Sequence, residues 1–167
     1  INEIEDFVGK IVVCTGEYSD LDNVKRVSIN EAIPIVALSS RPMDKRVFGV
    51  ISDEENDSMS RDFHFGYLKF MVKKKRRCRK VVVNSVGEGG IWVSDENGKL
   101  ENGDYITTSS IPGYGMKQHE SFVMSSTVAK ITCDCDFNIE SCIYRCEKDS
   151  YKHKHFKKAF VGCTYKC

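Results

Sequence analysis

The chain has 167 residues, of which 41% are hydrophobic and 29% are charged, and its formal net charge is +1. These totals are typical of one ordinary globular domain with a real core, and a charge so near zero selects no strongly charged partner. No apolar run approaches the ~20 residues that a membrane-spanning helix needs, so we expect no membrane span.

Short strand-like segments follow one another along the chain. Strands are predicted over 10–14, 24–29, 32–38, 46–52, 63–72, 81–86 and 91–93, from 127 onward, and over 159–165. Residues 28–33 are also compatible with a short helix, and 53–62 are predicted to form a mobile loop or hairpin tip. About ten short strands at this spacing predict an all-β single domain, similar to a barrel or a sandwich.

The stretch 81–118 is broken at short intervals by turn residues. These breaks are Gly87-Glu88-Gly89-Gly90, Asn97-Gly98, Asn102-Gly103 and Pro112-Gly113. Such spacing predicts consecutive tight β-hairpins. The first break is followed by strand-like Ile91-Trp92-Val93 and not by a helix, so it is a predicted glycine bulge or turn and not a phosphate-binding loop. We expect Trp92 to lie in the core or in a subunit contact.

The organisation predicted from these patterns is a β assembly domain over residues 1–135 and a Cys-rich C-terminal extension over 136–167 packed on it as a β-ribbon. Six of the eight cysteines lie in the last 35 residues: Cys133, Cys135, Cys142, Cys146, Cys163 and Cys167. Thiolates suit zinc, but no Cys-x-x-Cys pair is present, so buried free thiols explain the pattern best and disulfides are the next alternative. We therefore expect no cofactor and keep these six as candidate zinc ligands.

A cationic run precedes residue 81. It contains Lys73, Lys74, Lys75, Arg76 and Arg77, and a second basic cluster spans 152–158. Such runs can neutralise phosphates, but a solvated loop between two strands explains them better, so nucleic acid is not the expected partner.

Possible hydrolase residues are also present, namely Glu88, Asp104, Ser109, Ser110 and His119. Nothing in their spacing assembles a nucleophile with a base, because such triads are defined by geometry. We assign no catalytic residue.

Residues 103–117, reading GDYITTSSIPGYGMK, resemble the intramolecular-chaperone autoprocessing domain found at the C-termini of viral tail-spike, neck-appendage and fibre proteins. The strand-like 46–52 and 128–130 match neighbouring strands of that family, and the likeness covers about residues 8–135. The ending at 160–165 is similar to the branch in large DNA viruses. The residues that carry the motif, in a structural role, are Gly49, Gly103, Asp104, Tyr105, Ser109, Pro112 and Gly113.

The resemblance implies a homotrimer at the end of a viral fibre or capsid-associated protein, where the domain guides folding in the virion or in the host cell during assembly. Some members release themselves by cutting the peptide bond at their own N-terminal boundary with acidic residues. The family's junction motif is absent here, and near the start only Glu3, Glu5 and Asp6 offer carboxylates. Because the chain begins with Ile1, we expect a processed product, an excised fragment or the ordered part of something longer.

Three functions are therefore predicted. The first is a C-terminal trimerisation and intramolecular-chaperone module of a viral fibre or virion surface protein. The second is an autoproteolytic, self-releasing peptidase of the same fold, so enzyme activity stays open. The third is a zinc- or nucleic-acid-binding module that uses the Cys-rich tail and the basic run.

Overall fold

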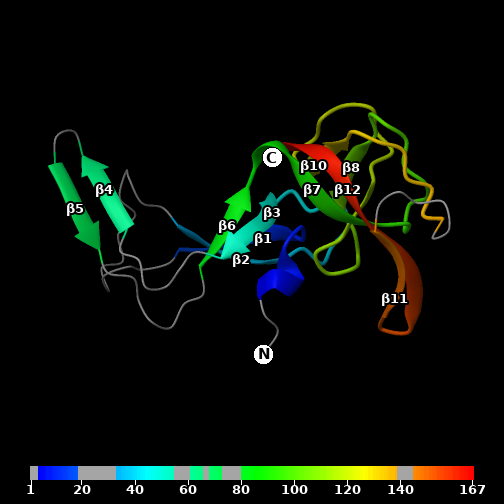
Figure 1. The fold of residues 1–167 in the computed structure, drawn as a ribbon, viewed down its shortest axis with the longest axis horizontal. Coiled ribbons are helices and arrows are strands. Elements are labelled where there is room, and N and C mark those ends of the chain that lie inside the picture. The colour runs from blue at the N-terminus through cyan, green and yellow to red at the C-terminus, as the bar shows by residue number, and fades with distance from the viewer. Residues whose placement is uncertain (1–3, 19–32, 55–60, 66–67, 73–79, 139–144) are drawn as a thin grey trace.

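The computed structural model describes the chain except for residues 1–3, 19–32, 55–60, 66–67, 73–79 and 139–144 (Figure 1). Within the described residues the fold is all-β, which confirms the predicted fold class, and a single 3-10 turn, η1 (Ile4–Phe7), is the only helical element. The strands are β1 (Ile11–Tyr18), β2 (Pro34–Leu38), β3 (Val47–Glu54), β4 (Arg61–Phe65), β5 (Leu68–Val72), β6 (Val81–Asn84), β7 (Val86–Ser94), β8 (Tyr105–Thr108), β9 (Gly115–Lys117), β10 (Thr127–Ile131), β11 (Arg145–Tyr151) and β12 (Lys154–Lys166).

The first half of the chain forms a four-stranded antiparallel sheet in the order β2-β1-β3-β6. Its apolar alternation is clearest in β2, where Ile35 and Ala37 face solvent while their neighbours are half-buried. A separate antiparallel pair, β4–β5, lies at one end of the molecule (Figure 1).

The second sheet closes on itself around β12. One edge of β12 pairs with β7 along residues 158–166, and the other pairs with β11 along 154–160 and then with β10 along 163–165. The sheet runs β10-β8-β9-β7-β12-β11, and the extra pairing of β12 with β10 makes a small five-stranded barrel. Only one residue pair, Val93 with Gly115, joins β7 to β9, so most of that edge of β7 has no partner strand among the described residues.

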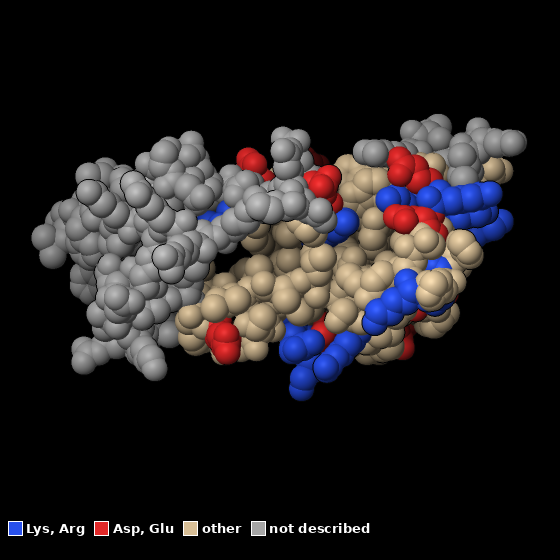
Figure 2. All heavy atoms as spheres, turned by 90° about the horizontal axis from the view of Figure 1, so that it is seen from below, with Lys and Arg blue, Asp and Glu red and all other residues tan. Residues whose placement is uncertain are grey.

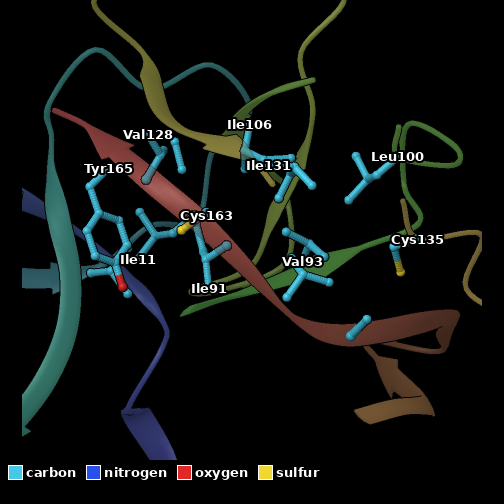
Figure 3. Packing of buried hydrophobic residues seen from close by; sticks show 14 of the residues in the cluster. Ile11, Ile91, Val93, Leu100, Ile106, Val128, Ile131, Cys135, Cys163 and Tyr165 are labelled. Carbon is cyan, nitrogen blue, oxygen red and sulfur yellow. The ribbon is translucent and has the colours of Figure 1, made fainter. Parts of the chain in front are cut away.

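The hydrophobic core lies inside this barrel and extends to the first sheet (Figure 3). Its buried members are Ile11, Val50, Ile91, Val93, Leu100, Ile106, Val128, Ala129, Ile131, Cys135, Phe137, Ala159, Val161, Cys163 and Tyr165. Both sheets contribute, since Ile11 belongs to β1 and Val50 to β3. Each fully buried aliphatic side chain of this size contributes about 1.5–3 kcal/mol relative to exposure.

The predicted series of consecutive hairpins is wrong between β7 and β8. These two strands do not pair with each other, because β7 pairs in parallel with β9, and only β8 and β9 form a hairpin in this stretch. Two turns separate β7 from β8, and between them Leu100 forms an isolated bridge with Cys135. The turns at Asn97-Gly98 and Asn102-Gly103 are present, but the predicted pairing of the strands on either side of them is wrong.

The prediction of a bulge or turn over residues 87–90 is also wrong. These residues belong to the uninterrupted strand β7, opposite residues 162–165 of β12. A side chain at Gly89 would collide with the ring of Tyr165, and one at Gly90 with the ring of Phe160. Glycine is therefore required here because aromatic rings of the neighbouring strand cross the backbone closely.

The single strand predicted over 63–72 consists of two antiparallel strands, β4 and β5, in which Phe63 pairs with Phe70 and Phe65 with Leu68. The strand predicted over 24–29, the short helix over 28–33 and the cationic run 73–77 lie outside the described residues. No helix among the described residues is long and apolar enough to cross a membrane.

The predicted division at residue 135 stays a prediction. A Cys-rich ribbon is not established as a separate tail, because β11 and β12 pair as a hairpin and β12 then continues through the barrel. Ala159, Val161 and Cys163 of β12 are buried in the same core as residues from the first 135.

Candidate functional site

A half-open cleft of about 430 Å³ lies where the N-terminal segment crosses the barrel. Three rings, three charged side chains and one valine line it: Trp92, Tyr114, Phe160, Asp6, Lys10, Lys158 and Val8. Its volume lies within the range of small-molecule pockets, about 300–1,000 Å³. Four parts of the chain meet here, namely residues 6–10, the strand β7, the β8–β9 turn and the strand β12.

The two-residue period of β12 explains why both a lysine and aromatic rings face the cleft. Ala159 and Val161 point into the barrel core, so Lys158 and Phe160 point to the opposite face. The Phe160 ring rests over Gly90 and over Gly9, where an added Cβ would lie 2.6 Å from the ring. Glycines on both neighbouring segments thus let the ring form the wall of the cleft.

Backbone hydrogen bonds hold the N-terminal segment against this wall. Gly9 N–H donates to Ile51 O at 2.8 Å, and Trp92 N–H donates to Gly9 O at 2.9 Å. Ile11 N–H then donates to Gly113 O at 2.8 Å. The side chain of Lys10 is therefore presented from a backbone that is tied to both sheets and to the β8–β9 turn.

The rings of the cleft are arranged edge to face. The Trp92 centroid lies 6.2 Å from that of Tyr114, at an interplanar angle of 66°, and 5.4 Å from that of Phe160, at 53°. Tyr114 in turn packs against Phe156 at 5.5 Å. Such contacts contribute about 0.5–1.5 kcal/mol per pair beyond area burial. Trp92, predicted in the core or a subunit contact, is half-buried in this smaller aromatic cluster.

Both lysines of the cleft lie near the ring of Tyr114. Lys10 Nζ lies 5.5 Å from the Tyr114 centroid, and Lys158 Nζ lies 6.0 Å from it and 5.5 Å from that of Trp92. Ammonium groups at these distances are attracted to the negative ring faces. Lys10 Nζ also lies 5.3 Å from the Phe7 centroid.

The two lysines differ in their anionic partners. Lys158 donates to Asp149 Oδ2 at 2.8 Å and pairs with Glu147 at 3.7 Å. Burial disfavours the Lys158 ammonium, but the hydrogen bond from Lys158 to Asp149, with the neighbouring charges, outweighs burial and raises its pKa. The same hydrogen bond lowers the pKa of Asp149.

Lys10 has no such partner among the described residues. Burial and the positive charge of Lys158 lower the pKa of Lys10, and the carboxylates of Asp6 and Asp149 offset this lowering only in part. Burial likewise raises the pKa of Tyr114, so its phenol stays neutral at physiological pH. The cleft therefore presents the Lys10 ammonium group, without an ion pair to a described carboxylate, next to the partly exposed ring of Phe160 and the half-buried ring of Trp92.

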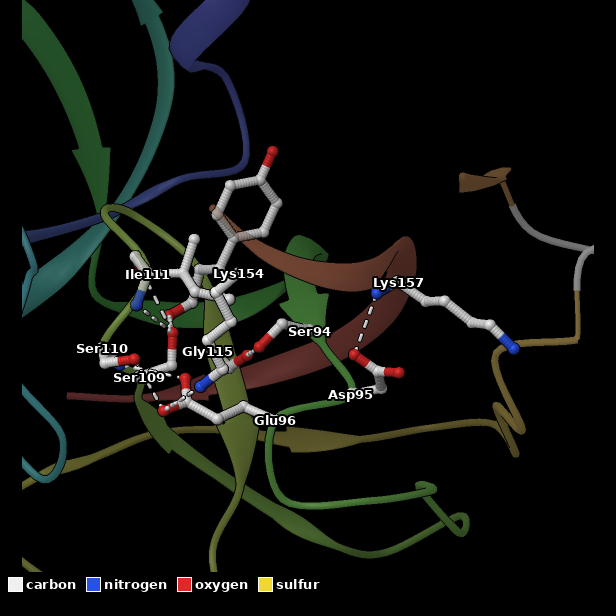
Figure 4. A network of polar contacts seen from close by, with 10 residues as sticks. Ser94, Asp95, Glu96, Ser109, Ser110, Ile111, Gly115, Lys154 and Lys157 are labelled. Atoms are coloured by element: carbon white, nitrogen blue, oxygen red, sulfur yellow. Dashed lines mark hydrogen bonds and ion pairs between the residues drawn. The ribbon is translucent and has the colours of Figure 1, made fainter. Parts of the chain in front are cut away.

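A polar network beside the cleft fixes the β8–β9 turn (Figure 4). Glu96 accepts hydrogen bonds from Ser110 Oγ at 2.7 Å and Ser110 N at 3.1 Å, and pairs with Lys154 at 3.6 Å. Asp95 Oδ1 accepts from Lys157 N at 2.9 Å. These contacts join the end of β7, the turn that carries Tyr114 and the start of β12.

Asp104, Ser109 and Gly113, from the motif that resembles the viral family, make contacts that stabilise turns of the fold. Asp104 Oδ2 accepts from Glu101 N at 2.8 Å and pairs with Lys117 at 3.1 Å. Ser109 is fully buried, and its hydroxyl donates to Tyr114 O at 2.7 Å. Gly113, with a φ of 80°, donates to Ser39 O at 2.8 Å, which joins the turn to the first sheet.

The remaining motif residues also lie in turns or in strands of the fold. Gly103 takes a φ of 97° in a turn and donates to Ile131 O at 2.9 Å, while Tyr105 begins β8. A side chain at Gly49 in β3 would collide with the backbone oxygen of Asn84, and Pro112 precedes Gly113 in the tight turn. Nothing tests their predicted family role, which stays a prediction.

Ser109 and His119, two of the residues considered for hydrolase chemistry and not assigned to it, have different surroundings. The Ser109 hydroxyl is committed to backbone carbonyls, and His119 is an exposed residue after β9. Of the three N-terminal carboxylates, Asp6 lines the cleft, Glu3 lies outside the described residues, and the side chain of Glu5 is not described.

The candidate zinc ligands differ in their states, although Cys133 and Cys167 both lie close enough to Cys163 to influence its thiol. Cys133, Cys135, Cys163 and Cys167 are free thiols, Cys146 is in a disulfide, and Cys142 lies outside the described residues. Burial raises the pKa of Cys163 to about 12 and that of Cys167 to about 11, which opposes the thiolate that zinc requires. No group of three or more metal-binding side chains is present in the part of the chain that is described.

The candidate nucleic-acid residues 73–77 lie outside the described residues, so they stay a prediction. The second basic cluster lies in the β11–β12 hairpin, where Lys154 pairs with Glu96 and Lys158 with Asp149. Figure 2 shows acidic side chains interleaved with basic ones toward this end of the molecule. Mixed charges of this kind are typical of a solvated face.

Sequence reasoning missed the cleft as a site. Its residues come from positions near 10, 92, 114 and 158, and no local motif joins them. One signal was available, because the pattern Phe156-x-Lys158-x-Phe160 places a lysine between two rings on one strand face. The Lys10 contribution has no comparable signal, since it depends on where the N-terminal segment crosses the barrel.

Comparison with models of protein families, with curated proteins and with solved structures found no match to this chain.

Proposed function

We propose that this domain is the C-terminal trimerisation and intramolecular-chaperone module of a viral fibre or virion surface protein, acting in the virion or in the host cell during assembly. The observation that carries the proposal is the form of the first sheet, whose two edge strands both present apolar side chains to solvent. The structural roles of the motif residues agree with a scaffold. Asp104, Ser109 and Gly113 hold turns and join the two sheets.

The edges of the first sheet differ from those of the barrel. β2 and β6 are its outer strands, and neither has a second partner strand among the described residues. Ile35 on β2 is 42% exposed and Val82 on β6 is 43% exposed. Tyr18 and Val86 extend the apolar surface beside these two edges. An edge strand with exposed apolar side chains is suited to pairing with another chain.

Two different edges on one subunit favour a ring. If β2 of one copy meets β6 of the next, the contact is head-to-tail, and such contacts close into cyclic oligomers when the rotation between copies allows it. A closed ring uses every edge once and covers both Ile35 and Val82. The number of copies, three, is what the resemblance implies.

The oligomer mass in solution tests the proposal. We expect light scattering behind a sizing column to give three times the chain mass at micromolar concentration. Ile35→Lys and Val82→Lys each place a charge on one edge and should yield monomer, because a buried unpaired charge opposes association. Mixing the two variants leaves one intact β2–β6 contact, so dimers should reappear.

Val123→Lys is the matched control, since Val123 is 53% exposed but lies in the loop after β9. Its mass should equal that of the unchanged protein. A monomeric parent protein at micromolar concentration, or edge variants that remain trimeric, would contradict the proposed assembly.

A further inference from the structure

We propose that the cleft lined by Lys10, Trp92, Tyr114 and Phe160 binds a small aromatic anion, with the anionic group on Lys10 and the planar ring against the aromatic side chains. This site is independent of the proposed assembly, because all of its residues come from one subunit.

The ammonium group of Lys10 defines the charged end of the site. It is half-buried at the cleft, and no carboxylate of the described residues forms an ion pair with it. The positive charge of Lys158 lies close enough to disfavour the Lys10 ammonium. A bound carboxylate or phosphate would relieve both the burial and the repulsion between the two lysines, since charge-assisted hydrogen bonds are strong in such surroundings.

The charges around the cleft favour an anionic ligand over a cationic one, because two nearby acidic residues are already paired with Lys158. Asp149 and Glu147 already pair with Lys158, at 2.8 and 3.7 Å. A cation in the cleft would meet two ammonium groups, both within 6.0 Å of the Tyr114 ring centroid. Asp6 is the remaining acidic residue of the lining, and it does not form an ion pair with Lys10.

The aromatic side chains define the other end. Phe160 is 36% exposed and lines the cleft, and its ring lies close to Gly9 and Gly90. Trp92 is tilted at 53° to Phe160, so the two rings form an angled wall and not a closed stack. A planar ligand ring can pack on this wall edge to face or with an offset, the arrangements that aromatic pairs prefer.

Backbone contacts pre-form the site, which lowers the cost of binding. Gly9, next to Lys10, is bonded on one side to Ile51 and on the other to Trp92. The ligand therefore need not order the main chain, and most of its contact energy is retained.

Trp92 is the only tryptophan of the chain, so its fluorescence reports on the cleft directly. The full chain is titrated with phenyl phosphate and with benzoate, and in parallel with inorganic phosphate and benzyl alcohol, which each supply one half of the ligand. We expect saturable quenching by at least one aromatic anion, and dissociation constants about tenfold or more higher for both half-ligands. Whichever of phenyl phosphate and benzoate binds more tightly shows whether the site prefers a phosphate or a carboxylate.

Lys10→Met should weaken binding of the aromatic anion about tenfold or more, and Lys10→Arg should restore part of it, because only a charge at this position is required. Lys99→Met removes an exposed lysine elsewhere and should bind like the parent protein. Absence of quenching by both aromatic anions, equally tight binding of benzyl alcohol, or unchanged affinity in a folded Lys10→Met variant would overturn the site. Should Lys10→Met fail to fold, the salt dependence of the parent protein decides, since added sodium chloride must weaken phenyl phosphate or benzoate but not benzyl alcohol.

Discussion

Replacing Thr108 by valine tests whether the barrel and the segment 39–46 are joined by a buried hydroxyl group. Thr108 is fully buried at the end of β8. Its Oγ1 donates to Arg41 O at 2.7 Å and accepts from Asp44 N at 2.8 Å. Valine has nearly the same shape, so Thr108→Val removes both hydrogen bonds and leaves no cavity.

The expected loss of stability follows from the hydrogen bonds that the Asp44 amide and the Arg41 carbonyl no longer make in the variant. Asp44 is only 7% exposed, so its amide would be buried without an acceptor, at a cost of about 1–3 kcal/mol. Arg41 is exposed, and its carbonyl can turn to water, so the second lost hydrogen bond costs about 0.5–1.5 kcal/mol. We expect the free energy of unfolding to fall by about 2–4 kcal/mol.

Urea denaturation followed by Trp92 fluorescence measures this change at a fixed protein concentration. The matched control is Thr15→Val, because the Thr15 hydroxyl also donates to a backbone carbonyl, Ile35 O at 2.9 Å, but is exposed. That control should change the free energy of unfolding by less than about 0.5 kcal/mol. A Thr108→Val protein as stable as the control would refute the reasoning that burial sets the cost.

Three further outcomes are expected. Burial raises the pKa of Cys163 to about 12, whereas the unfolded thiol titrates near 9.0. The protonated Cys163 thiol therefore makes its full contribution to the free energy of unfolding below pH 9, and this contribution falls as the pH rises toward 12. The loss is about 1.4 kcal/mol per pH unit, and Cys163→Ala should make the stability profile above pH 9 less steep in urea titrations; an unchanged slope would contradict this. The hydrogen bond from Arg46 lowers the pKa of Asp44, so that contribution is present above pH 3.8 and is lost as pH falls through the lower folded value. In Arg46→Met the carboxyl resonance of Asp44 should therefore titrate at a higher pH than in the parent protein, and an identical titration would argue against the pair. Finally, Gly113→Ala should lower the thermal midpoint more than Gly16→Ala, since both have positive φ but only an alanine at 113 would meet another atom, at 2.9 Å from Lys10 Cβ. Equal losses would show that backbone conformation alone sets the cost.

Local signals predicted the strands well because burial on one face imposes a two-residue period. Strand β3 at Val47–Glu54 and strand β10 at Thr127–Ile131 both lie where apolar alternation indicated them. The turn glycines at 98, 103 and 113 were likewise identified, and each has a positive φ. These features depend on the residues themselves and their nearest neighbours in sequence.

Pairing could not be predicted, because it depends on distant partners. Gly89 and Gly90 look like turn residues until Tyr165 and Phe160 are placed over them, and these rings come 76 and 70 positions later, respectively. The parallel contact of β7 with β9 has no local signature either. The cleft has the same origin, since Lys10 and Lys158 meet only once both ends of the chain are in place.

The central position of β12 has a consequence for synthesis. While the chain leaves the ribosome, β7 and β10 emerge before residues 154–166 exist, and at about 5–20 residues per second this interval lasts on the order of seconds. During that time the nascent strands β7 and β10 lack the partner that joins them. A message cut short before the codon for Lys154 would thus yield a product in which β7 and β10 permanently lack this partner, which is suited to aggregation and to removal by proteolysis.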